Sequence, residues 1–209
     1  MKTIAGRRRS IGLAAAAVWL IVISFVFVAW SLLAIGTPVA RVMLMGTLFL
    51  VAAFVATGIV VIRAALRLPV STTPRTPEEQ QMGRRFAWVF GAEMAAFAVV
   101  NPVLSATRHF ELMPSLNLIV VGVHFLPLAR IFRVPRYFVT GLLFCAIPVF
   151  TLIFIPKEFE IGDTLGWYVV PSLGCGLVAL LTAAAGLREA WQSVSLARGV
   201  ASQGSAQNL

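Results

Sequence analysis

Two ionisable side chains, Glu93 and His124, lie far inside long apolar stretches of the sequence. A carboxyl group and an imidazole in such surroundings can share or relay a proton, which is chemistry that membrane transporters use. An unpaired charge near the middle of a bilayer costs about 2.5–3.5 kcal/mol on insertion scales. We therefore expect either that the two side chains pair or that Glu93 is protonated.

The depths of these two side chains favour a pair. Glu93 lies eight residues after Arg85, and His124 lies six residues before Arg130. With a rise of about 1.5 Å per residue, they lie about 12 Å and about 9 Å from the same end of two consecutive antiparallel helices. The sequence thus predicts that Glu93 and His124 face each other.

Asn101 and Asn117 repeat this match nearer the opposite end, at about 24 Å and about 20 Å by the same rise. Asn117 precedes His124 by seven residues, so both project from one helix face. A polar seam between the two helices follows, with Glu93, His124, Asn101 and Asn117 as its members. The seam either handles a proton or a solute or, as neutral hydrogen-bonded groups, only locks the helices together.

The elements that carry these residues must cross a membrane. Hydrophobic residues make up 59% of the 209-residue chain and charged residues 12%, which is outside the range of soluble domains. The length leaves room for about six spans of ~20 residues, so we predict an all-α, polytopic membrane protein that folds as one bundle of six transmembrane helices. The predicted spans are residues 11–35, 39–66, 85–105, 115–134, 137–155 and 164–187. Residues 188–209 are expected to form a polar cytoplasmic tail, disordered over about its last ten residues.

Three polar patterns predict where helices begin. Thr76, followed by Pro77 and by a glutamate at Glu79, matches a capping box, so the third helix should start near Pro77, before it enters the membrane. Ser115 and Asp163 are the expected N-caps of the fourth and sixth helices.

Prolines and small residues mark further features of the spans. Pro127 removes a backbone donor beside His124, so the fourth helix should kink or locally unwind there. On the third helix, Gly91 and Ala95 repeat at four-residue spacing, as do Ala92 and Ala96. Such a face lets a neighbouring backbone approach closely, and Glu93 is expected to border it. The prolines expected to break their helices are Pro102, Pro127, Pro148 and Pro171.

The distribution of basic residues predicts the orientation. If the N-terminus is inside, fourteen of the seventeen Lys and Arg residues are cytoplasmic, and only Arg41, Arg108 and Lys157 are outside. This satisfies the positive-inside rule and predicts an inner-membrane protein with both termini in the cytoplasm. The apolar run at 11–35 is longer than the ~7–15 residues of a signal sequence and is expected to stay as an anchor. The arginines expected to set the topology and contact anionic headgroups, rather than bind a substrate, are Arg7, Arg8, Arg9, Arg84, Arg85, Arg130, Arg133 and Arg136.

The sequence lacks the usual signatures of catalysis and cofactor binding. Two histidines and two cysteines have no metal-ligand spacing, and Cys145 and Cys175 are expected to be free thiols. No nucleotide-binding loop, nucleophile elbow or H-E-x-x-H pattern is present. We predict no cofactor, no metal, no catalytic residue and no nucleic-acid partner, because topology accounts for the net charge of +9.

One segment resembles a known group of proteins. The run Gly122, Val123, His124, Phe125, Leu126, Pro127, Leu128, Ala129, continued by Pro135, Tyr137 and Gly141, is similar to small, functionally uncharacterised bacterial integral membrane proteins. The resemblance covers some twenty residues of one hairpin. It implies a multi-pass bacterial membrane protein without an assigned activity, and it offers no catalytic residue.

Two functions from different classes follow. The first is a non-catalytic protein that acts by association within the membrane, with a second copy or another membrane protein, because small-residue faces are present and no recognisable site is. The alternative is a small transporter or proton-coupled permease that uses Glu93 and His124. The sequence favours association.

Overall fold

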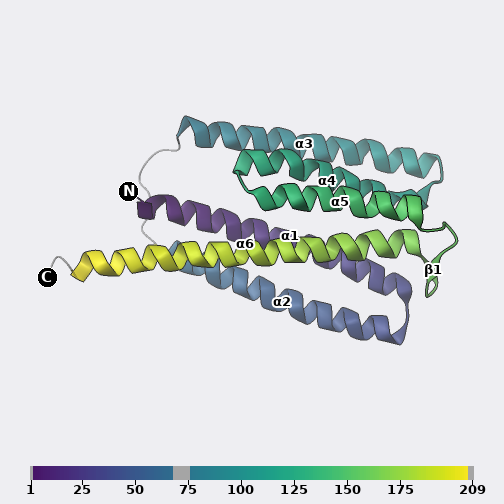
Figure 1. Cartoon of the computed structure of the whole chain (residues 1–209), viewed down its shortest axis with the longest axis horizontal. Coiled ribbons are helices and arrows are strands. Elements are labelled where there is room, and N and C mark those ends of the chain that lie inside the picture. The colour runs from purple at the N-terminus through teal and green to yellow at the C-terminus, as the bar shows by residue number, and fades with distance from the viewer. Residues whose placement is uncertain (1, 68–75, 207–209) are drawn as a thin grey trace.

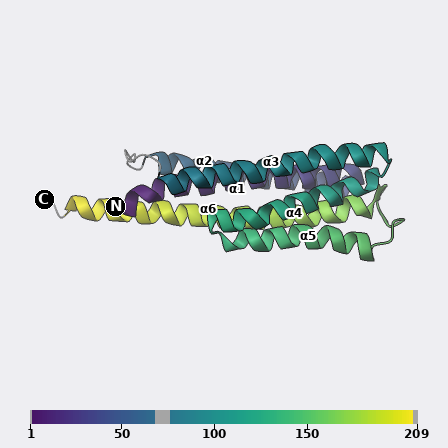
Figure 2. The same cartoon turned by 90° about the horizontal axis from the view of Figure 1, so that it is seen from above.

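The computed structural model describes residues 2–67 and 76–206 and has the expected all-α architecture. Within these residues, six helices are long and apolar enough to cross a membrane. They run alternately in opposite directions and form an elongated bundle (Figure 1 and Figure 2). The helices are α1 (Lys2–Ile35), α2 (Pro38–Leu66), α3 (Pro77–Ala106), α4 (Met113–Phe132), α5 (Pro135–Phe154) and α6 (Gly166–Ala206).

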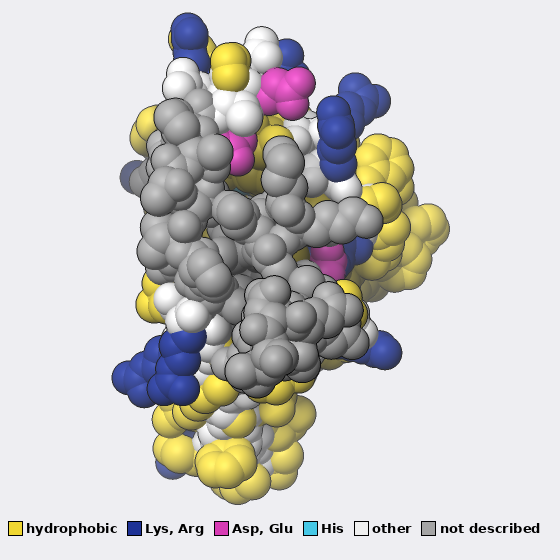
Figure 3. Space-filling model, turned by 90° about the vertical axis from the view of Figure 1, so that its left-hand side faces the viewer, with side chains coloured by type: hydrophobic (Ala, Val, Ile, Leu, Met, Phe, Trp, Pro, Cys, Tyr) yellow, Lys and Arg dark blue, Asp and Glu magenta, His cyan; other side chains and the backbone are white. Residues whose placement is uncertain are grey.

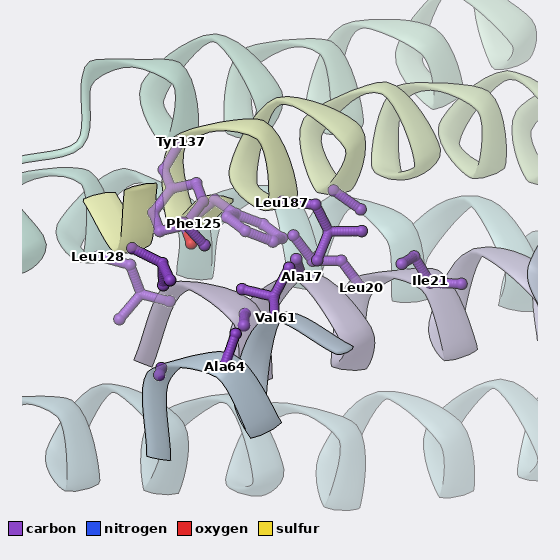
Figure 4. Packing of buried hydrophobic residues seen from close by; sticks show 14 of the residues in the cluster. Ala17, Leu20, Ile21, Val61, Ala64, Phe125, Leu128, Tyr137 and Leu187 are labelled. Carbon is purple, nitrogen blue, oxygen red and sulfur yellow. The ribbon is translucent and has the colours of Figure 1, made fainter. Parts of the chain in front are cut away.

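The helices pack as two groups of three. Helix α1 packs extensively against α2 and α6, while α4 packs against α3 and α5; α6 joins the two groups through α5 and α4. One buried apolar cluster spans this junction (Figure 4), with Ile21 from α1, Val61 from α2, Phe125 from α4, Tyr137 from α5 and Leu187 from α6. In lipid such contacts act mainly through close packing, because lipid tails are as apolar as the side chains.

The expected start of the third helix is confirmed. The Thr76 hydroxyl accepts a hydrogen bond from the Glu79 N–H at 3.2 Å, and the Glu79 carboxylate accepts one from the Thr76 N–H at 3.3 Å. Thr37 caps α2 in the same position, with Pro38 as the first helical residue. Threonine followed by proline therefore starts two of the helices.

The other two predicted caps are wrong. Helix α4 begins at Met113, directly after the 3-10 turn η1 (Phe110–Leu112), so Ser115 lies buried inside the first turn. Asp163 lies in the turn between the strands β1 (Glu160–Ile161) and β2 (Thr164–Leu165), which pair antiparallel before α6 begins. In both cases a compact connection replaces the side-chain cap.

The four prolines do not end their helices. Pro102, Pro127, Pro148 and Pro171 all lie inside helices that continue on both sides. The predicted local unwinding near His124 is therefore wrong, while a bend at Pro127 stays a prediction. Membrane helices tolerate proline because neighbouring groups and small backbone adjustments satisfy the freed carbonyl.

Helix α6 is longer than the predicted span. It continues beyond Leu187 to Ala206, so the expected disorder is wrong as far as Ala206. Ala190 and Val194 explain the extension: they follow Leu187 at helical spacing and are fully buried in the same cluster. This continuing apolar stripe holds α6 against the bundle as far as Val194.

Basic residues collect at one end of the bundle. The last turn of α2, the third turn of α3, the first turn of α5 and the end of α4 all carry arginines and lie toward the end of the bundle that holds the termini (Figure 1). Seen from that end, Lys and Arg side chains lie around the rim (Figure 3). Arg84, Arg85, Arg130 and Arg133 are exposed there. The side chains of Arg7, Arg8 and Arg9 lie outside those that the structure describes.

Candidate functional site

Helices α3 and α4 bring the two intramembrane ionisable groups together, as predicted. Glu93 Oε2 lies 3.2 Å from His124 Nδ1, and each side chain is only 10% exposed. Nδ1 has no hydrogen bond of good geometry, so the two side chains are in close polar contact without an aligned hydrogen bond. The predicted proximity is confirmed.

Aromatic rings and backbone surround this pair. The imidazole meets the ring of Phe125 edge-on, with centroids 5.9 Å apart, and it also lies near the backbone of Val89, one turn before Glu93. Two turns toward the basic end, Phe86 of α3 packs on Phe132 of α4 with centroids 5.9 Å apart. These two rings lie between the pair and that end of the bundle.

The second predicted pair is also present. Asn117 Nδ2 donates to Asn101 Oδ1 at 2.9 Å, and the Asn117 Oδ1 is buried without a partner among the described residues. This pair lies about 12 Å from Glu93 and His124 along the helices. The polar seam therefore has two separate contacts between α3 and α4.

The seam has a limited chemical repertoire. With one proton between them, the carboxyl and the imidazole are neutral as a unit, whether the proton lies on Glu93 or on His124. The pair can take up a further proton or act as a polar cross-link between helices. Among the described residues, no group of three His, Cys, Asp or Glu side chains is placed to hold a metal ion.

A close backbone contact that the sequence did not predict positions α4. A Cβ atom on Gly122 would lie 2.9 Å from the carbonyl oxygen of Gly141 on α5, and one on Gly141 would lie 2.7 Å from that of Gly122. Only glycine permits this approach. Because Gly122 is two residues before His124, the contact fixes α4 at the level of the seam. Both glycines lie in the segment on which the sequence resemblance rests, and that segment was the signal in the sequence that pointed to this contact.

Two polar contacts tie α5 to α6. Thr140 and Thr182 hydroxyls are 2.7 Å apart and buried, and Arg136 Nη1 donates to the Glu189 carboxylate. Arg136 was expected to contact lipid headgroups, but its side chain turns toward α6 because an acid is available there. Glu189 was missed in the sequence because it lies beyond the predicted end of the sixth span.

The small-residue face of α3 does not contact α4. Gly91 and Ala95 are exposed, whereas Ala96 is partly buried. A Cβ atom on Gly91 would meet nothing within 4 Å. Glu93 is turned about 200° away from Gly91 at 100° per residue, so it does not border the row of Gly91 and Ala95. It does border Ala96, which lies three residues later and is partly buried. Polar contacts hold one side of α3, and Gly91 and Ala95 lie on the other.

Two hollows on the described surface lie elsewhere. One is a shallow depression at Arg84 and Trp88, and the other lies between α2 and α6; Glu93 and His124 line neither. Comparison of this chain with protein-family models, with curated proteins and with solved structures finds no match.

Proposed function

We propose that this chain is a bacterial inner-membrane protein, of the kind that its Gly122–Ala129 segment resembles, and that it acts by association within the membrane. The observation that carries the proposal is the placement of α3. Among the described elements, α3 packs against α4 and η1, and Leu104 is its one buried residue. The side of this helix that carries Gly91 and Ala95 is exposed, and it is open to lipid or to another protein.

The uncovered side of α3 has the composition of a helix-docking face. Gly91 and Ala95 are separated by four residues, and Ala87 extends the row by one turn. Small residues at this spacing let two membrane helices approach closely enough for backbone contacts. Trp88 beside the row is 79% exposed, which provides a large apolar side chain to pack across such a contact. The partner that we propose is a second copy of the chain, with α3 against α3.

Substitution of Gly91 tests this proposal without disturbing the monomer. Because nothing lies within 4 Å of a Cβ at Gly91, Gly91→Leu should fold normally, yet it would hold two α3 helices apart. We expect lower dimer fractions for this variant in liposomes, measured by single-molecule photobleaching over a range of protein-to-lipid ratios.

A matched control is available on α2. A Cβ at Gly46 also meets nothing within 4 Å, so Gly46→Leu adds the same side chain to a different lipid-facing surface. It should leave the dimer fraction unchanged. A monomeric native protein at every ratio, or equal effects of the two substitutions, would rule out association through α3.

We further propose that both termini lie in the cytoplasm. The clustering of arginines at the end of the bundle that holds the termini supports this orientation, as does the acidic character of Glu158, Glu160 and Asp163 in the loop at the other end. A periplasmic reporter fused after Lys157 should be active, and one fused after Arg188 should be inactive. The reverse pattern of reporter activity would show that both termini lie in the periplasm and would contradict the proposed orientation.

Proton-coupled transport is the second candidate, and the Glu93–His124 contact of 3.2 Å at low exposure is the observation that favours it. If the pair carries protons, liposomes containing the protein should acidify under an inward proton gradient, and Glu93→Gln should abolish the signal. Equal proton flux in empty liposomes, or an unaffected Glu93→Gln variant, would exclude this role.

A further inference from the structure

A groove lies between α2 and α6, and the chain offers it a chemically defined occupant. It has a volume of about 700 Å³, within the ~300–1,000 Å³ range of ligand pockets. Val61 and Leu187, which are both buried, are among the residues that line it. Its walls are almost entirely apolar and include Leu50, Phe54 and Ala184.

The groove has the length of one membrane leaflet. Along α2 it extends from Leu50 to Val61, which is about 16 Å at 1.5 Å per residue. Half the hydrocarbon core of a bilayer is about 15 Å. A docked transmembrane helix would need a groove that crosses both leaflets, whereas a single acyl chain needs only this length.

The mouth of the groove carries positive charge at the basic end of the bundle. Arg188 and Trp191 line this mouth. Both are exposed, and among the described residues no acidic side chain pairs with Arg188. Arg63 follows Val60 by three residues and so shares its helix face, which places a second guanidinium on the same side of α2.

We propose that this groove binds an anionic glycerophospholipid from the leaflet at the end of the bundle where the termini lie. One acyl chain lies over Val61 and Leu187. The phosphate accepts hydrogen bonds from Arg188, because a guanidinium can form bidentate hydrogen bonds with phosphate oxygens. Trp191 lies at the headgroup level, where its amphipathic ring is favoured. This site lies on the other side of the bundle's junction from α3 and is independent of association through α3.

Lipid retention by the intact protein tests the proposal. The protein is purified from mixed vesicles of phosphatidylglycerol and phosphatidylcholine, and retained lipids are counted by native mass spectrometry. We expect at least one retained lipid with a preference for phosphatidylglycerol. Arg188→Gln should reduce that preference about fivefold, which is the contribution of one arginine near an anionic surface; Arg41→Gln, which changes an exposed arginine at the other end of α2, should not.

Filling the groove gives a second, independent readout. Ala53 lines the groove and its neighbour Ala52 does not, although both are exposed. Ala53→Phe should therefore lose the retained lipid, while Ala52→Phe keeps it, with both variants showing native helical content by circular dichroism. Equal retention of the two lipids by the native protein, retention that survives Ala53→Phe, or protection of the groove by a second copy instead of lipid would each overturn the proposal.

Discussion

Replacing both Glu93 and His124 should lower the free energy of unfolding by less than the sum of the losses caused by the two single substitutions. Glu93→Met removes the carboxyl from beside the buried imidazole, and His124→Phe removes the imidazole from beside the buried carboxyl. A buried polar group that loses its partner costs about 1–3 kcal/mol. Because each side chain is only 10% exposed, water cannot readily replace the lost partner.

Replacing both groups removes the pair and its desolvation together. Such replacements by apolar side chains of similar size are often nearly neutral. Polar contacts between membrane helices show coupling energies averaging about 0.6 kcal/mol and reaching about 1.7 kcal/mol. A polar contact at 3.2 Å between side chains that are only 10% exposed belongs near the upper value, so we expect a coupling of about 1–2 kcal/mol.

The free energy of unfolding can be measured by SDS titration in mixed lipid–detergent micelles, with far-ultraviolet circular dichroism as the signal. A cycle between Glu93 and Asn117 provides the control, because these residues belong to different contacts about 12 Å apart. That cycle should be additive within about 0.5 kcal/mol. Additive effects of Glu93→Met and His124→Phe would mean that the observed contact contributes nothing, and the reasoning would fail.

Three further predictions concern the contacts that hold α4, α5 and α6. Gly122→Ala should destabilise the protein by about 1–3 kcal/mol, because the added methyl group would lie 2.9 Å from a backbone oxygen; Gly91→Ala should instead be neutral or stabilise by up to about 1 kcal/mol through helix propensity, and a stable Gly122→Ala variant would contradict the packing. Thr182→Val, which removes one of two hydroxyls 2.7 Å apart, should lower the free energy of unfolding by about 0.6–1.7 kcal/mol in the same titration, and a Thr140→Val background should abolish that effect. Glu189→Gln should lower the free energy of unfolding because it weakens the hydrogen bond that Arg136 Nη1 donates to the Glu189 carboxylate. The Nε and Nη2 atoms of Arg136 have no hydrogen-bond partner among the described residues. Unchanged stability would show that solvent satisfies the guanidinium.

Features that repeat along the chain could be predicted from the sequence. Hydrophobic run lengths gave the number and order of the helices, because a bilayer demands spans of one length. The capping box at Thr76 was readable because its partners are three residues apart. The Glu93–His124 contact was also predictable, since a shared helix end and a constant rise convert sequence distance into depth.

Features that depend on helix rotation were not predictable in this way. Depth placed Glu93 correctly, but the neighbour of Gly91 could not be inferred, because depth does not determine which side of α3 faces α4. The approach of Gly122 to Gly141 and the bond from Arg136 to Glu189 join helices through single positions without a periodic signal. The caps proposed at Ser115 and Asp163 failed for a similar reason, since a 3-10 turn and a two-residue hairpin leave no strong pattern.

The polar seam and the open face of α3 follow from the same physical constraint. In lipid, an apolar side chain loses little when it exchanges a protein neighbour for an acyl chain, whereas a buried polar side chain loses its only partner. The rotation of α3 is therefore set by Glu93 and Asn101 rather than by its apolar residues, of which only Leu104 is buried. By directing the polar side chains toward α4, the seam leaves Gly91 and Ala95 on the outer side. A contact that only locks two helices thus also determines which surface α3 offers to a partner.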